Sequence, residues 1–383
     1  MYTLLICIIY LSFISLGLPD STLGAAWPVM YDSFGVPISY MGIVAMVISG
    51  GTIISSLLSN KLTKKYGTNV VTTISVFLTG LALLGFSFSN RFWMLMILAI
   101  PYGLGAGAID AALNNYVALH YSSRHMTWLH SFWGVGTIIS PFIMSYSLSN
   151  FTWNDGYRFI SYIQLGIGVI LILTLPVWKV NSIQIEEGEK SPTLSIKNAL
   201  MIKGVKTLLI AFLCYCAAEG TAMAWSCTYL VKQKGMDEIT ASAYASMFFI
   251  GMTFGRFLAG FISDKLGDRK MINIGTIGIL IGVSLLVVPV ENVYISLVGL
   301  LIIGIGCAPI YPCIIHSTPT NFGAENSGAI IGIQMASAYV GATFMPPLFG
   351  WIAEMFGFGI FPIYILVFVL LMLYMINKTF SAV

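Results

Sequence analysis

Ionisable side chains inside long apolar stretches are the residues of this sequence best placed to do chemistry. They are the acids Asp20, Asp110 and Glu219 and the base Arg256. An unpaired charge at the centre of a lipid bilayer costs at least ~2.5 to 3.5 kcal/mol on insertion scales, so such groups usually face a water-filled cavity or a partner. These four side chains are therefore the first candidates for handling an ion or a proton.

Asp20 stands beside two residues that interrupt a helix. Gly17 and Pro19 precede it, and a proline removes a hydrogen bond from the helical backbone. Within a membrane such a break is tolerated only where the backbone lines a cavity or meets another helix. The sequence thus predicts a carboxylate next to a helix discontinuity.

Asp110 and Glu219 lie among small residues. Asp110 follows the glycines of segment 103–107, which allow neighbouring helices to approach closely, and Asn114 lies one turn after the acid. Glu219 follows two alanines and precedes Trp225 by one and a half turns. Both acids are therefore expected where helices pack against one another.

These acids have the chemistry that proton-coupled transport requires. Burial disfavours the charged form of a carboxyl group, so such an acid can take up a proton from one side of a membrane and release it to the other. We predict Asp20, Asp110 and Glu219 as proton-coupling residues. The alternative is that each carboxyl group only makes fixed hydrogen bonds to neighbouring helices.

The elements that carry these acids are predicted to be membrane-spanning helices. Hydrophobic residues make up 57% of the 383 residues, charged residues only 9%, and the mean hydropathy is +0.89, which leaves too little polar surface for a water-soluble globule. Long unbroken apolar runs favour helices over the alternating strands of a membrane barrel. We predict twelve spans, at 2–30, 36–58, 68–88, 92–119, 126–149, 157–178, 201–231, 239–262, 271–289, 292–317, 326–353 and 358–377. The first is expected to be retained because it lacks the features of a cleaved signal peptide.

The positive charges predict the orientation. Of the 18 lysines and arginines, thirteen fall in loops on the side of the N-terminus and only Arg91, Arg158, Lys232 and Lys234 on the other side. Because positive loops stay inside, both termini are expected in the cytoplasm and the protein in the cytoplasmic membrane. The net charge of +3 thus reflects topology, and no basic patch for nucleic acid is expected.

Metal, cofactor and enzyme chemistry find little support in the sequence. All six cysteines fall inside predicted spans, and Cys214 and Cys216 are two residues apart, so they face different directions on a helix. No H-E-x-x-H or G-x-S-x-G motif occurs. We therefore expect no metal site, no cofactor and no enzymatic activity.

One polar stretch divides the chain into two halves. We predict a bundle of six helices at 1–178, a cytoplasmic linker at 179–200 and a second bundle of six at 201–383. The halves share an element, since Gly51, Lys65 and Gly67 recur at an offset of 200 residues. Internal symmetry of this kind is typical of transporters that bind their substrate between two repeats.

The second copy of this element resembles a known family. The segment GFISDKLGDRK resembles the G-x-x-x-D-x-x-G-x-x-[KR] loop of the major facilitator superfamily, whereas the first copy is degraded and has Lys64 in place of the loop's acid. The resemblance implies the major facilitator fold: an all-α membrane protein of two pseudo-symmetric six-helix bundles. It also predicts a conformational latch, with Arg256 reaching toward Asp264 from two turns away; a solvated turn is the alternative. The latch residues are Gly260, Asp264, Gly267, Arg269 and Arg256.

Within that superfamily the chain resembles the fucose:proton symporter family and its sugar-transporting relatives. The similarity is carried by Asp20 before Trp27-Pro28, by Asp110 before Asn114, by Tyr215, Ala217, Glu219 and Trp225, by Tyr311-Pro312-Cys313, and by His130 before Phe132 and Gly134. The chain departs from the family pattern at Ala217, Cys313 and His130.

Aromatic rings and polar side chains in the spans suit polyol recognition, because rings stack on sugar C–H faces while amides and acids bind hydroxyls. His130 is a candidate for binding a sugar hydroxyl or for a proton path with Asp110, and a packing role is the alternative. The predicted substrate-binding residues are Trp27, Asn114, Asn115, His130, Trp133, Glu219, Trp225, Tyr311, Gln334 and Tyr339.

Together these observations predict a monomeric secondary active transporter in the lipid bilayer. It would move a small polar solute, a sugar or related polyol, by alternating access coupled to protons. A drug or metabolite:proton antiporter is the nearest alternative, for which segment 136–145 carries only a degraded motif. A sugar uniporter, a transporter-like sensor and a membrane-embedded enzyme are the others.

Overall fold

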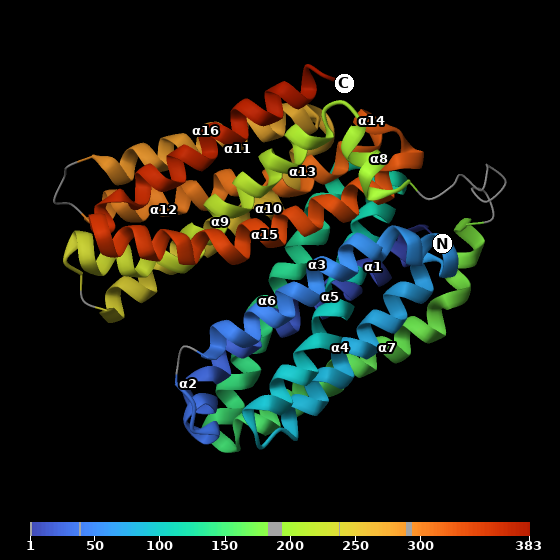
Figure 1. Ribbon diagram of the computed structural model, residues 1–383, viewed down its shortest axis with the longest axis horizontal. Coiled ribbons are helices and arrows are strands. Elements are labelled where there is room, and N and C mark those ends of the chain that lie inside the picture. Colours follow the sequence, from blue (N-terminus) through green and yellow to red (C-terminus); the bar gives the residue numbers. More distant parts are fainter. Residues whose placement is uncertain (1, 38–39, 183–193, 237, 289–292) are drawn as a thin grey trace. The chain divides into compact units, whose positions relative to one another are not determined.

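The computed structural model describes residues 2–37, 40–182, 194–236, 238–288 and 293–383, and these residues form helices without any strand (Figure 1). The first half holds α1 (Tyr2–Asp20), α2 (Thr22–Phe34), α3 (Tyr40–Tyr66), α4 (Thr68–Ser87), α5 (Phe92–His120), α6 (Ser123–Asn150) and α7 (Trp153–Ser182). The second holds α8 (Ile196–Met201), α9 (Val205–Lys234), α10 (Glu238–Leu266), α11 (Asp268–Val287), α12 (Val293–Cys307), α13 (Ile310–His316), α14 (Thr318–Phe322), α15 (Ala324–Phe356), the 3₁₀ turn η1 (Phe358–Ile360) and α16 (Phe361–Phe380). The all-α prediction is confirmed.

Eleven helical stretches among the described residues are long and apolar enough to cross a membrane. The fifth predicted span, 126–149, forms the long helix α6 but is not among these eleven. Polar side chains such as Ser131, Thr137 and Ser140 interrupt its apolar sequence. Such side chains can bind neighbouring helices, and the Ser140 hydroxyl lies 2.8 Å from the Ser21 hydroxyl between α1 and α2.

Two of the predicted spans are interrupted where the sequence has helix-breaking residues. The first span breaks at Ser21, between the end of α1 and the start of α2. The span 292–317 breaks between α12 and α13, where Pro309 precedes the first residue of α13. The prediction of a discontinuity beside Asp20 is confirmed.

The internal repeat has a structural counterpart in each half. Gly67 and Gly267 adopt positive φ angles of 85° and 77°, and each precedes the first residue of the next helix, α4 or α11. Gly51 of α3 lies against the backbone of α5 at Gly103. In the same way, Gly251 of α10 lies against the backbone of α12 at Leu301. The glycines therefore serve the same turn and the same close helix approach twice.

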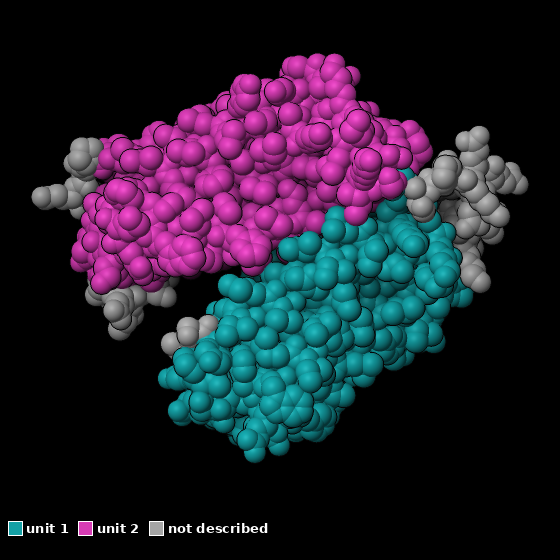
Figure 2. Space-filling view, viewed as in Figure 1, with its two compact units in different colours: residues 1–116, 129–194 teal, residues 117–128, 195–383 magenta. Residues whose placement is uncertain are grey.

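The chain divides into two compact units (Figure 2). Unit 1 comprises residues 1–116 and 129–194, and unit 2 comprises residues 117–128 and 195–383. The end of α5 and the start of α6 thus belong to unit 2, although they lie in the N-terminal half of the sequence. Of the predicted linker 179–200, residues 183–193 lie outside the described residues.

Candidate functional site

Asp20 is held in unit 1 by side chains from two other helices. Its Oδ1 accepts a hydrogen bond from the Tyr102 hydroxyl of α5 at 3.2 Å, and its Oδ2 accepts one from the Trp133 indole Nε1 of α6 at 2.8 Å. Asp20 is nevertheless exposed, whereas Tyr102 is buried. A carboxylate is thus accessible on a membrane-spanning helix while both of its oxygens are occupied.

The close approach of α1 and α6 makes this arrangement possible. A Cβ atom on Gly17 would lie inside 3.0 Å of the Trp133 carbonyl oxygen, and one on Gly136 inside 3.0 Å of the Ile14 carbonyl oxygen. One turn further, the hydroxyl of Ser21 donates to the Thr137 carbonyl at 2.7 Å. The two glycines therefore set the distance between the helix that carries the acid and the helix that carries its indole partner.

A second polar network in unit 1 is buried. Asn114 Nδ2 donates to Asp110 Oδ1 at 2.8 Å, and Asn114 Oδ1 lies 3.1 Å from His130 Nε2. Because the amide nitrogen is used on Asp110, its oxygen must accept, so His130 Nε2 carries a proton. The exposed fractions of Asp110, Asn114 and His130 are 4%, 0% and 6%, and the Phe13 ring packs edge-on against the imidazole. Carboxylate, amide and imidazole thus form a continuous chain from α5 to α6.

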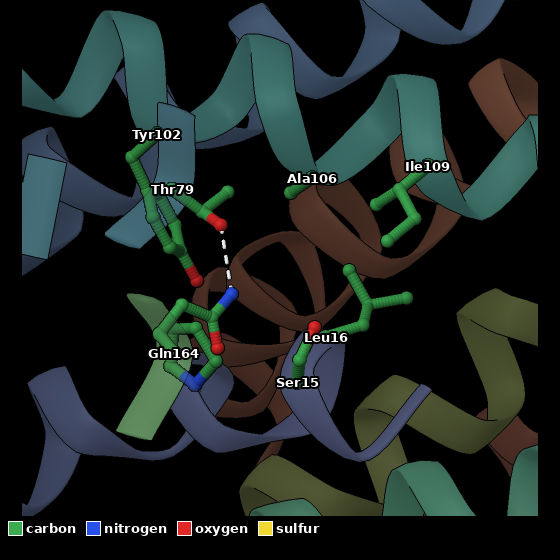
Figure 3. Close-up of a pocket in the computed structure, with 8 residues that line it drawn as sticks. Ser15, Leu16, Thr79, Tyr102, Ala106, Ile109 and Gln164 are labelled. Carbon is green, nitrogen blue, oxygen red and sulfur yellow. Dashed lines mark hydrogen bonds between the residues drawn. The ribbon is translucent and has the colours of Figure 1, made fainter. Parts of the chain in front are cut away.

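A small pocket adjoins the Asp20 cluster (Figure 3). Pro19 and Tyr102 line it, and Gln164 of α7 donates across it to Thr79 of α4 at 2.8 Å. The Gln164 Oε1 atom is buried without a hydrogen-bond partner among the described residues. The remaining lining residues are Ser15, Leu16, Ala106 and Ile109.

Unit 2 contains a buried ion pair. Arg256 of α10 donates from a terminal nitrogen to Glu219 Oε1 of α9 at 3.1 Å, and the Tyr215 hydroxyl lies 2.8 Å from the same oxygen and 2.9 Å from the Cys307 carbonyl. That carbonyl ends α12, where helical partners are missing. The Arg256 side chain is 5% exposed and that of Glu219 13%, so the carboxylate is the more accessible charge.

Several predicted substrate-binding residues of unit 2 have partners in the helix packing. The Trp225 indole donates to the Pro346 carbonyl at 2.8 Å. Gln334 is fully buried and accepts from Thr318 at 3.0 Å. The ring of Tyr311 lies 4.7 Å from that of Phe212, and its hydroxyl contacts the Met335 sulfur. Tyr339 is half-buried on α15.

The predicted latch acid binds the connection between α5 and α6. Asp264 accepts from the Arg124 backbone N–H at 2.9 Å and from the Ser122 hydroxyl at 3.0 Å, and it forms an ion pair with the Arg124 side chain at 3.2 Å. Gly260 lies directly under the Trp128 indole, where a Cβ would be inside 3.0 Å of Nε1. Arg256 directs its guanidinium to Glu219 instead, which corrects the expectation that it reaches toward Asp264.

The last residue of the predicted latch lies elsewhere in unit 2. The guanidinium of Arg269 stands over the Phe380 ring at 5.1 Å. Gly267 supplies the positive φ angle between α10 and α11.

Among the described residues, no group of three His, Cys, Asp or Glu is arranged to hold a metal ion.

Comparison with known proteins decides the family. A family model described as Major Facilitator Superfamily matches residues 9–237 and 207–381. The chain belongs to the Major Facilitator Superfamily. This match confirms the predicted membership, and it agrees with the expectation of a transporter and not an enzyme.

The relatives of this transporter are distant in sequence. Bypass of stop codon protein 6 of Saccharomyces cerevisiae is 24% identical over 288 residues, and the chain spans 56% of that protein and 67% of its own length in this match. The glucose/mannose transporter GlcP of Bacillus subtilis is 21% identical over 362 residues, covering 89% of the chain and 86% of GlcP. The crystal structure of the E. coli fucose:proton symporter FucP matches with a TM-score of 0.74 at 17% identity over 98% of each chain. The fold of this transporter is therefore shared with FucP.

The structure of the transporter brings some of the predicted residues together. Asp20 meets Trp133, and Asp110 meets Asn114 and His130. Trp27 is placed differently, since it is 3% exposed in α2 and packs edge-on against Phe92. The half-buried Asn115 follows Asn114 on α5.

Other residues of the transporter's polar clusters are not predicted by the sequence patterns. Tyr102 donates to Asp20, and Gln164 lines the adjoining pocket. A polar glutamine within the apolar run of α7 is a signal that the sequence does provide. Tyr215 belongs to the sequence pattern shared with the fucose:proton symporter family, but no role is predicted for it. His316 gave no signal, because its partners come from segments 48 and 195 residues away.

Proposed function

We propose that this transporter moves a small polar solute, a sugar or related polyol, by alternating access coupled to protons, with Asp20 exchanging the coupling proton. The observation that carries the proposal is the Asp20 carboxylate, exposed at the end of α1 and bound by donors from α5 and α6. An accessible acid in a membrane span marks a path for ions or protons.

Protonation of Asp20 would alter the contact between two helices. The Trp133 indole is a donor only, so it needs an acceptor at Oδ2. A proton on that oxygen competes with the indole and weakens the tie between α1 and α6, whereas loss of the proton restores a charge-assisted bond. The protonation state of Asp20 is thereby linked to the packing of the helix that carries it.

Asp110 supplies a second site for a proton. Its carboxylate is connected through Asn114 to the N–H of His130, so uptake of a proton at one end changes the hydrogen bonds at the other. Because these groups are buried, such changes involve bonds that water does not replace. We assign this chain a supporting role in proton exchange, with His130 as the group that can bind a second proton.

The accessible charges favour a solute with many hydroxyl donors. In unit 1 the Asp20 carboxylate is exposed at the end of α1, and in unit 2 Glu219 is more exposed than its partner Arg256. Carboxylates accept hydrogen bonds from hydroxyls, whereas an anionic solute would be repelled. The relative GlcP is a glucose/mannose transporter and FucP a fucose:proton symporter, which agrees with this solute class.

We propose the following orientation of the transporter in the membrane. Both termini lie in the cytoplasm, the protein resides in the cytoplasmic membrane, and it acts as a monomer. The bundles 1–178 and 201–383 move about the solute while the linker 179–200 joins them. The excess of Lys and Arg in loops on one side supports this orientation.

Proton uptake by proteoliposomes tests the function. Purified protein is reconstituted with a pH-sensitive dye in the lumen, and hexoses, pentoses, polyols and organic anions are added in turn. We expect a sugar or polyol to acidify the lumen in the wild type, and Asp20→Asn to abolish the pH change while retaining solute counterflow. Asp32→Asn, which neutralises an exposed acid of α2, is the matched control and should behave as the wild type.

Each alternative gives a different result in the same assay. An unchanged pH response in the double variant D20N/D110N would remove both acids from the coupling role. Counterflow without any pH response would indicate a uniporter, and a pH change of opposite sign an antiporter. A response confined to organic anions would refute the proposed solute class.

A further inference from the structure

A cluster of polar groups in unit 2 surrounds His316, the last residue of α13. The imidazole Nδ1 lies 2.7 Å from Asp268 Oδ2, at the start of α11, and Nε2 lies 3.0 Å from the carbonyl oxygen of Tyr121. Tyr121 belongs to the connection between α5 and α6. The ring therefore joins three segments that are far apart in the sequence.

The two partners of His316 require an extra proton. A carbonyl oxygen only accepts hydrogen bonds, and so does an ionised carboxylate, whereas a neutral imidazole has one N–H. With Asp268 ionised, both bonds form only when His316 is the doubly protonated imidazolium. The number of protons is the same if the proton between the two side chains sits on Asp268. In either case the His316–Asp268 pair holds one proton more than an ionised Asp268 beside a neutral His316.

Loss of that proton breaks one particular bond. A neutral ring can keep Nδ1–H on Asp268, but its Nε2 then turns a lone pair toward the Tyr121 carbonyl at 3.0 Å. Two acceptors at this distance repel each other. Deprotonation thus leaves α13 joined to α11 and releases α13 from the α5–α6 connection.

The neighbouring groups hold the same connection in a way that does not depend on His316. Asp268 Oδ1 accepts from the Ser123 hydroxyl at 2.6 Å. Asp264, at the end of α10, binds Ser122 and Arg124. The Tyr121 bond is therefore one of several ties, and it is the one that depends on the protonation of His316.

Other titratable groups face this cluster from the packed elements. Cys313, one turn before His316 on α13, lies 3.8 Å from the Ser123 hydroxyl. The negative charge of Asp264, which forms an ion pair with Arg124, acts on the imidazole. His125 stands one residue after Arg124 in the first turn of α6, and burial lowers its pKa. His125 therefore stays neutral near pH 7, and its titration lies at more acidic pH than the ordinary range of histidine.

We propose that His316 is a proton-dependent tie that fastens the α5–α6 connection to the ends of α11 and α13, so that the pH on this side of the membrane sets how readily the transporter changes conformation. The inference rests on the transport function and not on the identity of the solute or on the coupling proton. Protonated His316 holds the tie, and rising pH releases it. By the predicted topology, this side is the cytoplasmic one.

Solute exchange at equal pH tests the tie. Proteoliposomes with the same concentration of a transported sugar and the same pH inside and outside are compared at pH 6.0 to 8.5, so that neither a gradient nor the orientation of the protein matters. We expect wild-type exchange to be about tenfold slower at the acidic end, the effect of one hydrogen bond to a charged group. His316→Arg keeps two donors at every pH and should stay slow; His316→Gln does not titrate and should stay fast.

The control variant is His125→Gln, which removes the adjacent histidine and should retain the wild-type pH profile. Thermal unfolding of the detergent-solubilised variants supplies a readout without transport: the midpoint of His316→Gln should fall below that of the wild type at pH 6.0 and match it at pH 8.5. A wild-type pH profile that persists in His316→Gln, or equal profiles for the Gln and Arg variants, would overturn the proposal. Either result is independent of whether Asp20→Asn abolishes proton uptake.

Discussion

Replacing Gly17 by alanine should separate α1 from α6 and disturb the Asp20 site before it unfolds the protein. An added Cβ would come within 3.0 Å of the Trp133 carbonyl oxygen, and it would lie at 3.1 Å from the Thr137 backbone nitrogen. These are backbone atoms, so no flexible side chain can move aside. The two helices must therefore shift apart by most of an ångström.

The size of the effect follows from the contacts that depend on this spacing. Overpacking of a tight interface typically costs about 1 to 3 kcal/mol, against which alanine gains up to about 1 kcal/mol over glycine in a helix. The net loss of stability should be about 0 to 3 kcal/mol. The bond from Trp133 to Asp20 is 2.8 Å long, and a shift of the helices lengthens it toward the limit of a hydrogen bond. The coupling of solute to protons should thus be impaired more than folding.

Gly24→Ala is the matched control, because a Cβ at Gly24 in α2 meets no atom within 4 Å. Thermal unfolding and substrate-induced proton uptake are measured for both variants in parallel. We expect Gly24→Ala to be as stable as the wild type or slightly more stable, with full uptake, and Gly17→Ala to lose most of the uptake. Equal uptake in the two variants would refute the reasoning that the spacing of α1 and α6 maintains the Asp20 site.

Three further predictions concern other parts of the molecule. Arg256→Met should destabilise the protein by about 3 to 5 kcal/mol, because Glu219 is left as an uncompensated buried charge. In thermal unfolding, E219Q/R256M should recover most of that loss. An equal loss in both variants would contradict the ion-pair interpretation. Asn114→Leu should lower the free energy of unfolding by about 1 to 3 kcal/mol, because Asp110 and His130 lose the amide that they share. The control Leu113→Ala removes core packing on the same helix and should leave the pH dependence of uptake unchanged. Asp264→Asn should lower stability by no more than about 1 kcal/mol, because its ion pair with Arg124 is partly exposed, yet it should speed solute exchange; an unchanged exchange rate would remove Asp264 from the latch.

The helices and their breaks follow from local properties of the sequence. Apolar length predicts where a helix crosses the bilayer, and Pro19 with Gly17 marks the break after Asp20, because each signal acts on the backbone within a few residues. The repeat at Gly67 and Gly267 can be recognised from the sequence for the same reason, since both positions need a positive φ. The family loop around Asp264 is likewise a local pattern.

The sequence by itself therefore determined which segments are helices, which acids lie within them, and the superfamily whose loop they contain. The partners of those acids were decided by tertiary structure: Tyr102 and Trp133 reach Asp20 from 82 and 113 residues away, Arg256 turns to Glu219 and not to the acid on its own helix, and His316 meets Tyr121 across 195 residues. A span's apolar composition fixes its position in the membrane but not its rotation about its own axis. That rotation depends on glycine contacts such as Gly17 with Gly136, and it selects the side chain that each acid meets.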